Sequence, residues 1–83
     1  MTDLLLEFKK AIGAEGNNNL DSQLSFFLNE AKGYLVQAGV SEAILNSDKS
    51  VGVIIKGAYD LWNDGALSSY FYQRADYLRG LKE

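Results

Sequence analysis

The side chains best suited to chemistry in this sequence are carboxylates. Asp60 and Asp64 stand four residues apart, which is about one helical turn, and Asp21 and Glu30 are two further acids within one predicted helix. Paired carboxylates can bind a metal ion or transfer protons, but both tasks need a further ligand or a base close by. The spacing supplies neither, so the favoured interpretation is that these acids are solvated surface residues.

Cysteine and histidine are both absent from the 83 residues. Their absence argues against thiol nucleophiles, imidazole bases, the usual zinc sites and disulfide frameworks. Two glycine-containing stretches also fail as ligand loops: "GVIIKG" (52–57) matches no phosphate-loop pattern, and "DGALSS" (64–69) lacks the alternating oxygen ligands of an EF-hand. The sequence therefore predicts no catalytic residue, no metal and no cofactor.

Charge and length restrict the function further. The net charge is −3, and no basic run is longer than the two residues Lys9 and Lys10, so the basic face that tight nucleic-acid binding requires is missing. The start "MTDLLLEFKK" does not resemble a signal peptide, and the longest apolar run, 51–55, is far shorter than the roughly 20 residues of a membrane span. We expect a soluble cytosolic protein with no membrane partner.

The elements that position these residues are predicted to be helices. Proline is absent, and residues that favour helices recur at helical spacing, which predicts a single all-α domain over residues 1–83. Thr2 and Asn19 are the expected N-caps of the first two helices, and Ser41 and Ser47 are the next cap candidates. The prediction is a small bundle of about four helices with a short helical turn near 42–45, the helices covering approximately 3–12, 20–38, 48–63 and 69–81.

The stretch "VGVIIKGAYDLWNDG" (51–65) is the most apolar part of the chain and is predicted to form the central helix. A strand would place Lys56 and Asp60 on the same side as Ile54, whereas a helix places both charges opposite an apolar face. That face is predicted to comprise Val51, Ile54, Ile55, Ala58, Leu61 and Trp62. The glycines of this helix, Gly52 and Gly57, lie on its two flanks, where neighbouring helices could approach closely.

The chain has more aromatic residues than its predicted core positions need. Five tyrosines, four phenylalanines and one tryptophan occur in 83 residues. One interpretation is that some, such as Tyr34 and Tyr59, border the core with their hydroxyls in water; the other is that the surplus forms protein interfaces, where aromatic residues are enriched. Both remain open at this point. The candidate interface residues are Phe26, Gly33, Gly52, Gly57, Tyr70, Tyr72 and Tyr77.

Most of the chain, from Leu4 to Leu81, resembles the short head-tail connector (adaptor) proteins of long-tailed double-stranded DNA phages and their prophages. The resemblance is carried by "LLLEFKKAIG", "LDSQLSFFLNEAKGYLVQAGV", "SDKSVGVIIKGAYDLWNDG" and "LSSYFYQRADYLRG" in that order. Its most specific parts are "GVIIKGAYDLWN" and "SSYFYQRADYL". The N-terminal part is a generic pattern of a helix hairpin.

The resemblance implies a structural virion protein without catalysis. Such a protein assembles as a ring, typically of about a dozen subunits, beneath the portal vertex of the filled capsid. There it extends the DNA channel and joins the capsid to the tail or to the next head-completion protein. The partners implied are therefore the chain itself, the portal protein, a downstream completion or tail protein, and genomic DNA that passes without sequence-specific binding. An acidic chain suits such a channel, because strong attraction to phosphates would impede passage.

The sequence also allows two other functions to be considered. In a small DNA-binding or regulatory domain, "SEAILNSDKSVGVIIKGAYDLW" would form a helix-turn-helix, but its recognition helix would offer Lys49, Lys56 and little else to the bases. A small enzyme would need an acid pair with a strongly raised pKa in a pocket, and the spacing indicates none. A gel shift on random duplex DNA separates the first alternative from a connector.

Overall fold

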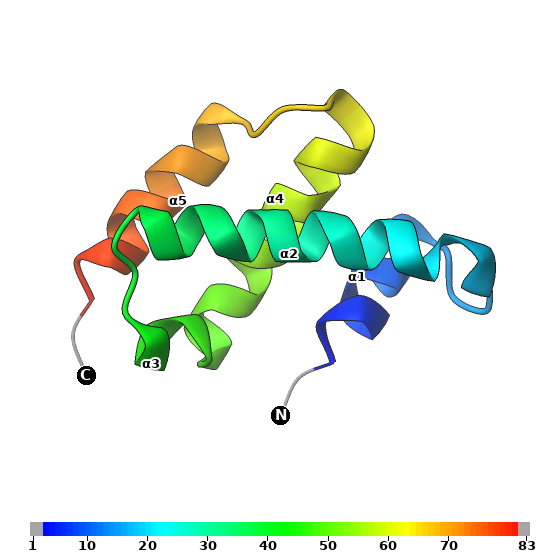
Figure 1. The fold of residues 1–83 in the computed structure, drawn as a ribbon, viewed down its shortest axis with the longest axis horizontal. Coiled ribbons are helices and arrows are strands. Elements are labelled where there is room, and N and C mark those ends of the chain that lie inside the picture. The colour runs from blue at the N-terminus through cyan, green and yellow to red at the C-terminus, as the bar shows by residue number, and fades with distance from the viewer. Residues whose placement is uncertain (1–2, 82–83) are drawn as a thin grey trace.

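The computed structural model describes residues 3–81 and confirms the all-α fold. Within that range the chain forms five α-helices and two short 3₁₀ turns, with no strand (Figure 1). In chain order these elements are α1 (Leu4–Ile12), η1 (Asn18–Leu20), α2 (Asp21–Gln37), α3 (Glu42–Leu45), η2 (Asp48–Ser50), α4 (Val51–Asp64) and α5 (Ser69–Arg79).

The helix α4 occupies the centre of the bundle. The helices α1, α2 and α5 all pack against it, and the long helix α2 crosses it in the foreground of Figure 1. The short elements α3 and η2 lead the chain from the end of α2 into α4. The result is a flattened body with extents of 37 × 27 × 16 Å.

The first helix begins one residue later than predicted. The side chain of Asp3 accepts a hydrogen bond from the backbone N–H of Leu6 at 3.1 Å, so Asp3 is the N-cap and the helix starts at Leu4. Thr2, the predicted cap, lies outside the described residues. The helix ends at Gly13 as predicted, and the left-handed backbone there, with φ of 72°, favours glycine.

The second helix also begins later than predicted, because a 3₁₀ turn precedes it. Asn19 was predicted as the cap but lies inside η1, where its N–H donates to the side chain of Asn17 at 3.0 Å. The cap predictions further along are confirmed. The Ser41 Oγ accepts from the Ile44 N–H, and the Ser47 Oγ accepts from the Lys49 N–H, each at 3.2 Å.

The predicted third and fourth helices also differ from the structure at their ends. Residues 48–50, predicted as the first turn of the third helix, form η2 instead, and α4 runs one residue beyond the predicted end, up to Gly65 with its φ of 74°. The helix α5 ends at Arg79, two residues before the predicted end. Its Ser68 cap accepts a hydrogen bond from the Phe71 N–H at 3.2 Å.

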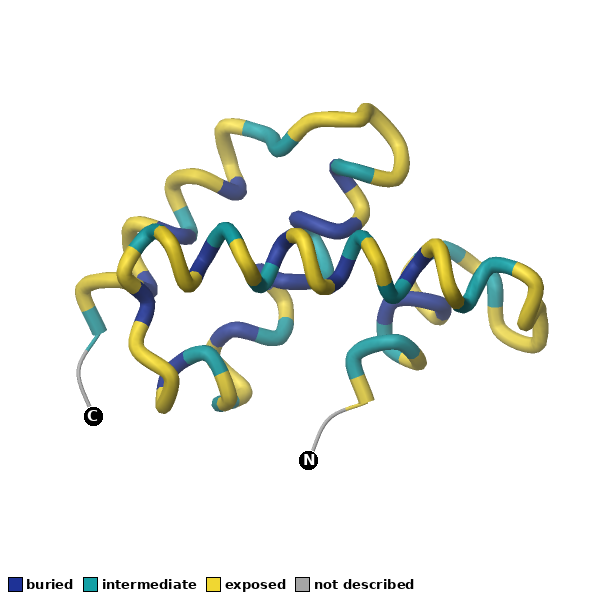
Figure 2. Tube along the Cα trace, viewed as in Figure 1, coloured by how far each residue is buried: buried dark blue, intermediate teal, exposed yellow. Residues whose placement is uncertain are grey.

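The core lies where α2, α4 and α5 meet, with contributions from α1 and α3 (Figure 2). Helical spacing in the last predicted helix places Leu67, Phe71, Ala75 and Leu78 inward, and the last three are buried, whereas Leu67 lies in the turn before α5 and is half-buried. On α2 the predicted inward stripe is Leu20, Leu24, Phe27, Ala31, Tyr34 and Ala38. The buried stripe is centred closer to Leu28 and Leu35, so Phe27 and Tyr34 are only half-buried. The buried apolar residues are Phe8, Leu24, Leu28, Ala31, Leu35, Val40, Ile44, Val53, Ile54, Ala58, Phe71, Ala75 and Leu78.

The buried face of α4 is rotated from the predicted face by about a quarter turn. Trp62 was predicted in the core but is 37% exposed, whereas Asp60, predicted on the solvent side, is 1% exposed. The reason is Gly57, which is buried at the contact with the neighbouring helices. A Cβ at this position would lie 2.7 Å from Phe71 Cδ1 and 3.0 Å from Ala31 Cβ, so the missing side chain lets α5 and α2 approach this side of α4.

A buried lysine joins α1 to the start of α2. The Lys9 Nζ donates to Asp21 Oδ1 at 2.8 Å and to Asn18 Oδ1 at 3.1 Å. Lys9 is 7% exposed, and a buried ammonium group is tolerated only when it is paired in this way. Asp21, one of the acids considered above for chemistry, is therefore engaged in holding two helices together.

Candidate functional site

A buried carboxylate fixes the turn between α4 and α5. Asp60 Oδ1 accepts a hydrogen bond from Lys56 Nζ at 2.7 Å. Asp60 Oδ2 accepts from the Ser68 hydroxyl at 2.6 Å and from the Ser68 N–H at 3.2 Å. Since Ser68 also caps α5 through the Phe71 N–H, one carboxylate connects the central helix to the first turn of the last helix.

The charges of this network shift two pKa values. Burial by itself raises the pKa of Asp60, but the hydrogen bonds from Lys56 and Ser68, together with the lysine charge, outweigh burial, and the net pKa is lowered. The hydrogen bond to Asp60 in turn raises the pKa of Lys56. Asp60 is thus held ionised, which is the opposite of the raised pKa that a general acid would need at neutral pH.

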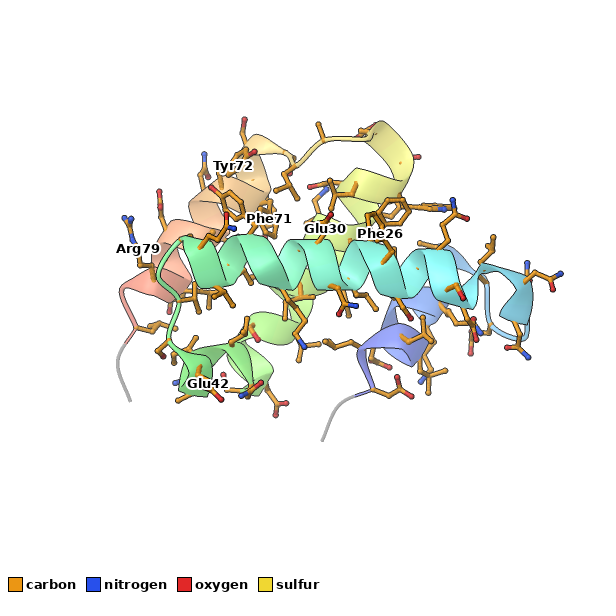
Figure 3. The ribbon with its side chains drawn as sticks, viewed as in Figure 1. Phe26, Glu30, Glu42, Phe71, Tyr72 and Arg79 are labelled. Carbon is orange, nitrogen blue, oxygen red and sulfur yellow. The ribbon has the colours of Figure 1, made fainter. Side chains whose placement is uncertain are left out.

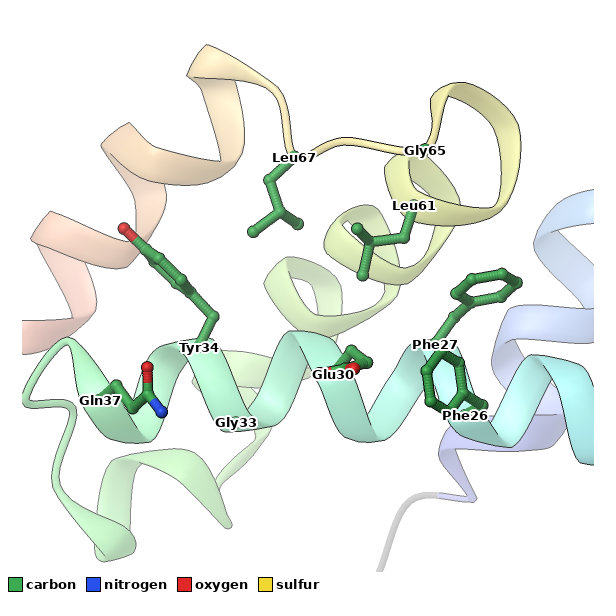
Figure 4. A pocket seen from close by; sticks show the side chains of 9 residues that line it. All are labelled: Phe26, Phe27, Glu30, Gly33, Tyr34, Gln37, Leu61, Gly65 and Leu67. Carbon is green, nitrogen blue, oxygen red and sulfur yellow. The ribbon is translucent and has the colours of Figure 1, made fainter.

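A groove of about 510 Å³ runs between α2 and the turn that joins α4 to α5. Figure 4 shows Leu61 and Leu67 on the wall opposite α2, and Tyr34 rising from α2 toward α5 at one end of the groove. The α2 side bears a stripe at helical spacing, Phe26, Glu30 and Gly33, whose first two members are also labelled in Figure 3. The remaining lining residues are Phe27, Gln37 and Gly65.

The groove is mostly apolar, and its polar side-chain groups are the Glu30 carboxylate, the Gln37 amide and the Tyr34 hydroxyl. Phe26 is 57% exposed, although aromatic side chains of this size are usually more buried. Glu30 makes no ion pair with any residue in the range 3–81. Gly33 leaves a gap in the α2 wall, because a Cβ built there would meet no atom within 4 Å. The groove therefore offers an open apolar surface with an unpaired negative charge.

A second hollow, of about 320 Å³, lies between the start of α4 and α5 and is basic. Its lining includes Lys49, Lys56 and Arg74, together with Gly52 and Tyr70. Next to it the guanidinium of Arg74 lies 4.8 Å from the centre of the Tyr77 ring, a distance typical of a cation–π contact. Arg74 has no carboxylate partner among residues 3–81.

The groove and the basic hollow lie on opposite sides of α4. Leu61 lines the groove and Gly52 lines the hollow, and nine residues at 100° each place them about 180° apart around the helix. The helix α5 shows the same division. Tyr72 packs against Tyr34 of the groove with ring centres 5.2 Å apart, while Tyr70 lies on the other flank of the buried face.

Six of the seven candidate interface residues are exposed, and the structure divides them between these two sides. Gly57 is the exception and is wrong as a subunit contact, because it is buried under Phe71 and its close approach is within the chain. The sequence interpretation did not single out Glu30 and Arg74 as interface residues. On the groove side lie Phe26, Gly33 and Tyr72, and on the basic side lie Gly52, Tyr70 and Tyr77.

The acids considered for chemistry do not converge. Asp60 is bound by Lys56 and Ser68, Asp21 by Lys9, and Asp64 accepts from the Asn63 side-chain amide at 3.2 Å. Over residues 3–81 no three potential metal-ligating side chains form a cluster, and none of the helices there is long and apolar enough to cross a membrane.

The arrangement of α4 disfavours the helix-turn-helix alternative. A recognition helix usually presents several basic or amide side chains to the bases, whereas the exposed residues of α4 are Gly52, Tyr59, Trp62, Asn63 and Asp64. Its predicted partner α3 has only four residues, Glu42–Leu45. Lys49 and Lys56 both line the hollow beside α5, and Lys56 is already paired with Asp60.

Comparison of the chain with protein-family models, curated proteins and solved structures finds no match. The class that fold and site define is a small all-α domain with two accessible, chemically different surfaces on opposite sides. Its functional interpretation rests on these surfaces and on the resemblance described above.

Proposed function

We propose that this chain is a structural subunit of a phage head-tail connector, which assembles as a ring under the portal. The observation that carries the proposal is the presence of two different exposed surfaces, one apolar and acidic and one aromatic and basic, on opposite sides of one domain. The resemblance of residues 4–81 to connector proteins supports it independently.

Two unlike surfaces on opposite sides favour head-to-tail assembly. When one patch of a subunit binds a different patch of the next, the contact is heterologous, and repetition gives a closed ring or an open filament. Two-fold dimers need the same patch on both partners, which this arrangement does not favour. A domain of 83 residues also buries a modest share of its surface alone, so assembly adds stability.

In this function the chain has several partners. Its neighbours in the ring are copies of itself, about a dozen in all as the resemblance implies. The portal protein lies above the ring and a head-completion or tail protein below it, at the head-tail junction of the virion, after assembly in the host cytoplasm. The net charge of −3 suits a channel through which DNA passes without being bound in a sequence-specific manner.

The test is native mass spectrometry of the chain mixed with the portal protein of the same phage or prophage, followed by negative-stain imaging. We expect the chain to form closed rings, either alone or when the portal is present, with several copies bound in one symmetric complex. A chain that stays monomeric and does not bind the portal would contradict the proposal. Binding to random duplex DNA at low salt and micromolar protein would instead support the helix-turn-helix alternative.

A further inference from the structure

The stripe formed by Tyr70, Arg74 and Tyr77 is an unpartnered face of α5. The three residues are spaced i, i+4 and i+7, so their side chains form one line along the helix. Tyr70 and Tyr77 are both 55% exposed, and Arg74 lies between them against the Tyr77 ring. Helices that bind in grooves are typically anchored by residues at this spacing.

The groove contains a stripe with the same spacing and the complementary charge. Phe26, Glu30 and Gly33 are also spaced i, i+4 and i+7, so both stripes extend over about 10 Å. A carboxylate occupies the middle of one stripe and a guanidinium the middle of the other. Since the charged residue is central in both, the two charges meet whether the helices run parallel or antiparallel.

We propose that the Tyr70–Arg74–Tyr77 stripe of one copy docks into the groove of the next copy, with Arg74 paired to Glu30. The open space at Gly33 receives one tyrosine ring, and Phe26 packs against the other. Both charges lack an ion-pair partner among residues 3–81 and gain one on docking. This inference rests on the proposed function, because it identifies the contact between neighbours in the ring.

The contact explains why the two stripes lie on different sides of the domain. Because the α5 stripe and the groove do not face each other within one chain, the stripe cannot enter the groove of the same copy. Each copy therefore has one stripe and one groove free for neighbours. Repetition of this single contact gives a ring when the rotation between copies closes. The partner that fits the groove is therefore a second copy of this chain.

Charge reversal tests the pairing. We expect Glu30→Arg and Arg74→Glu, each alone, to weaken assembly by about 30-fold or more, because each places like charges at the centre of a desolvated contact. The double variant should recover most of the assembly, since the pair is restored in the opposite sense. Glu15→Arg and Arg79→Glu are the matched controls on exposed sites outside both stripes and should assemble like the wild type.

Substitution of Gly33 tests the groove independently of charge. Gly33→Ala places a methyl group in open space and should raise the melting temperature by roughly 2–8 °C, because alanine favours helix over glycine. Gly33→Leu should remain as stably folded as the wild type but occupy the space that receives the tyrosine ring. Assembly should therefore be lost in the leucine variant, in which the fold is intact.

The outcomes separate this inference from the proposed function. If the wild type forms rings and both charge-reversed variants do so equally well, or the double variant fails to recover, the docking mode is wrong while the connector function stands. A Gly33→Leu variant that assembles like the wild type also contradicts the docking mode. If the wild type forms no ring alone or with the portal, both proposals are wrong.

Discussion

Gly57→Leu should lower the melting temperature by about 8–16 °C or leave the chain unfolded. A side chain at this position meets Phe71 and Ala31 at once, with a Cβ only 2.7 Å from Phe71 Cδ1. Overpacking of this kind costs typically 1–3 kcal/mol or more, while leaving glycine adds back about 0.5–1 kcal/mol of helix propensity. A net loss near 2 kcal/mol corresponds to the expected shift for a domain of this size.

The matched control is Gly52→Leu on the same helix. A Cβ at Gly52 meets nothing within 4 Å, so the leucine variant should melt at the wild-type temperature or slightly above. Thermal denaturation followed by circular dichroism measures both variants. Equal melting temperatures for the two would show that α5 does not approach α4 closely at Gly57, and the rotated core face would then be wrong.

Asp60→Asn should cost about 1–3 kcal/mol of unfolding free energy at neutral pH. All three groups that contact the carboxylate are donors, from Lys56 and from the hydroxyl and N–H of Ser68. Asparagine directs its own NH₂ toward one of these donors, which leaves a buried group without an acceptor. Urea denaturation measures the loss, and Asp64→Asn, at an exposed site, is the control with an expected change near zero.

The same comparison has a defined pH dependence. Because the folded-state pKa of Asp60 is lowered, its contribution to stability is fully present above the unfolded-state pKa and is lost as the pH falls through the folded-state pKa. Asparagine does not titrate, so the difference between wild type and variant should be largest near neutral pH and narrow in acid. A difference that is constant with pH would show that the ionised carboxylate is not what fixes the turn.

The sequence predicted the number and approximate positions of the helices because several of their ends are determined locally. Ser41 and Ser47 cap the helices that follow them, and Gly13 and Gly39 end the ones that precede them, through backbone geometry that involves only a few neighbouring residues. The inward face of α5 was predicted correctly because its apolar residues recur at helical spacing on one side of the helix.

The face of α4 was predicted incorrectly because its cause lies in distant residues. A helical pattern treats Gly57 as neutral and Asp60 as exposed, yet α5 approaches α4 at Gly57, and Asp60 is buried and accepts a hydrogen bond from Ser68. Neither partner can be identified from the spacing within 51–65. The ion pair between Lys9 and Asp21 escaped prediction for the same reason, since its residues belong to different helices.

The candidate site was only partly predictable. Exposed aromatic residues at unusual helical positions identified both surfaces in outline, through Phe26 on one side and Tyr70 and Tyr77 on the other. The groove itself needs the turn between α4 and α5 to lie across α2, and this depends on the Asp60–Ser68 contact. The matching spacing of Phe26–Glu30–Gly33 and Tyr70–Arg74–Tyr77 is present in the sequence. It indicates a contact between copies only when both stripes are known to be exposed.

The central claim is that copies of this chain join through opposite surfaces, and chemical cross-linking tests it most directly. The chain has no cysteine, so a variant with Gln37→Cys and Gln73→Cys carries one thiol beside each stripe and keeps the Glu30–Arg74 pair. Thiols that flank the pair are too far apart for a direct disulfide, so a bismaleimide is the suitable linker. The control variant carries Glu15→Cys with Gln73→Cys.

The cross-linked protein is analysed on a denaturing gel after incubation with and without the portal protein. The account predicts a ladder of covalent oligomers for the variant with cysteines at 37 and 73, because each thiol reaches a neighbour, and little product for the control. A variant that remains monomeric on the gel under both conditions, or a control that gives the same ladder, would contradict it.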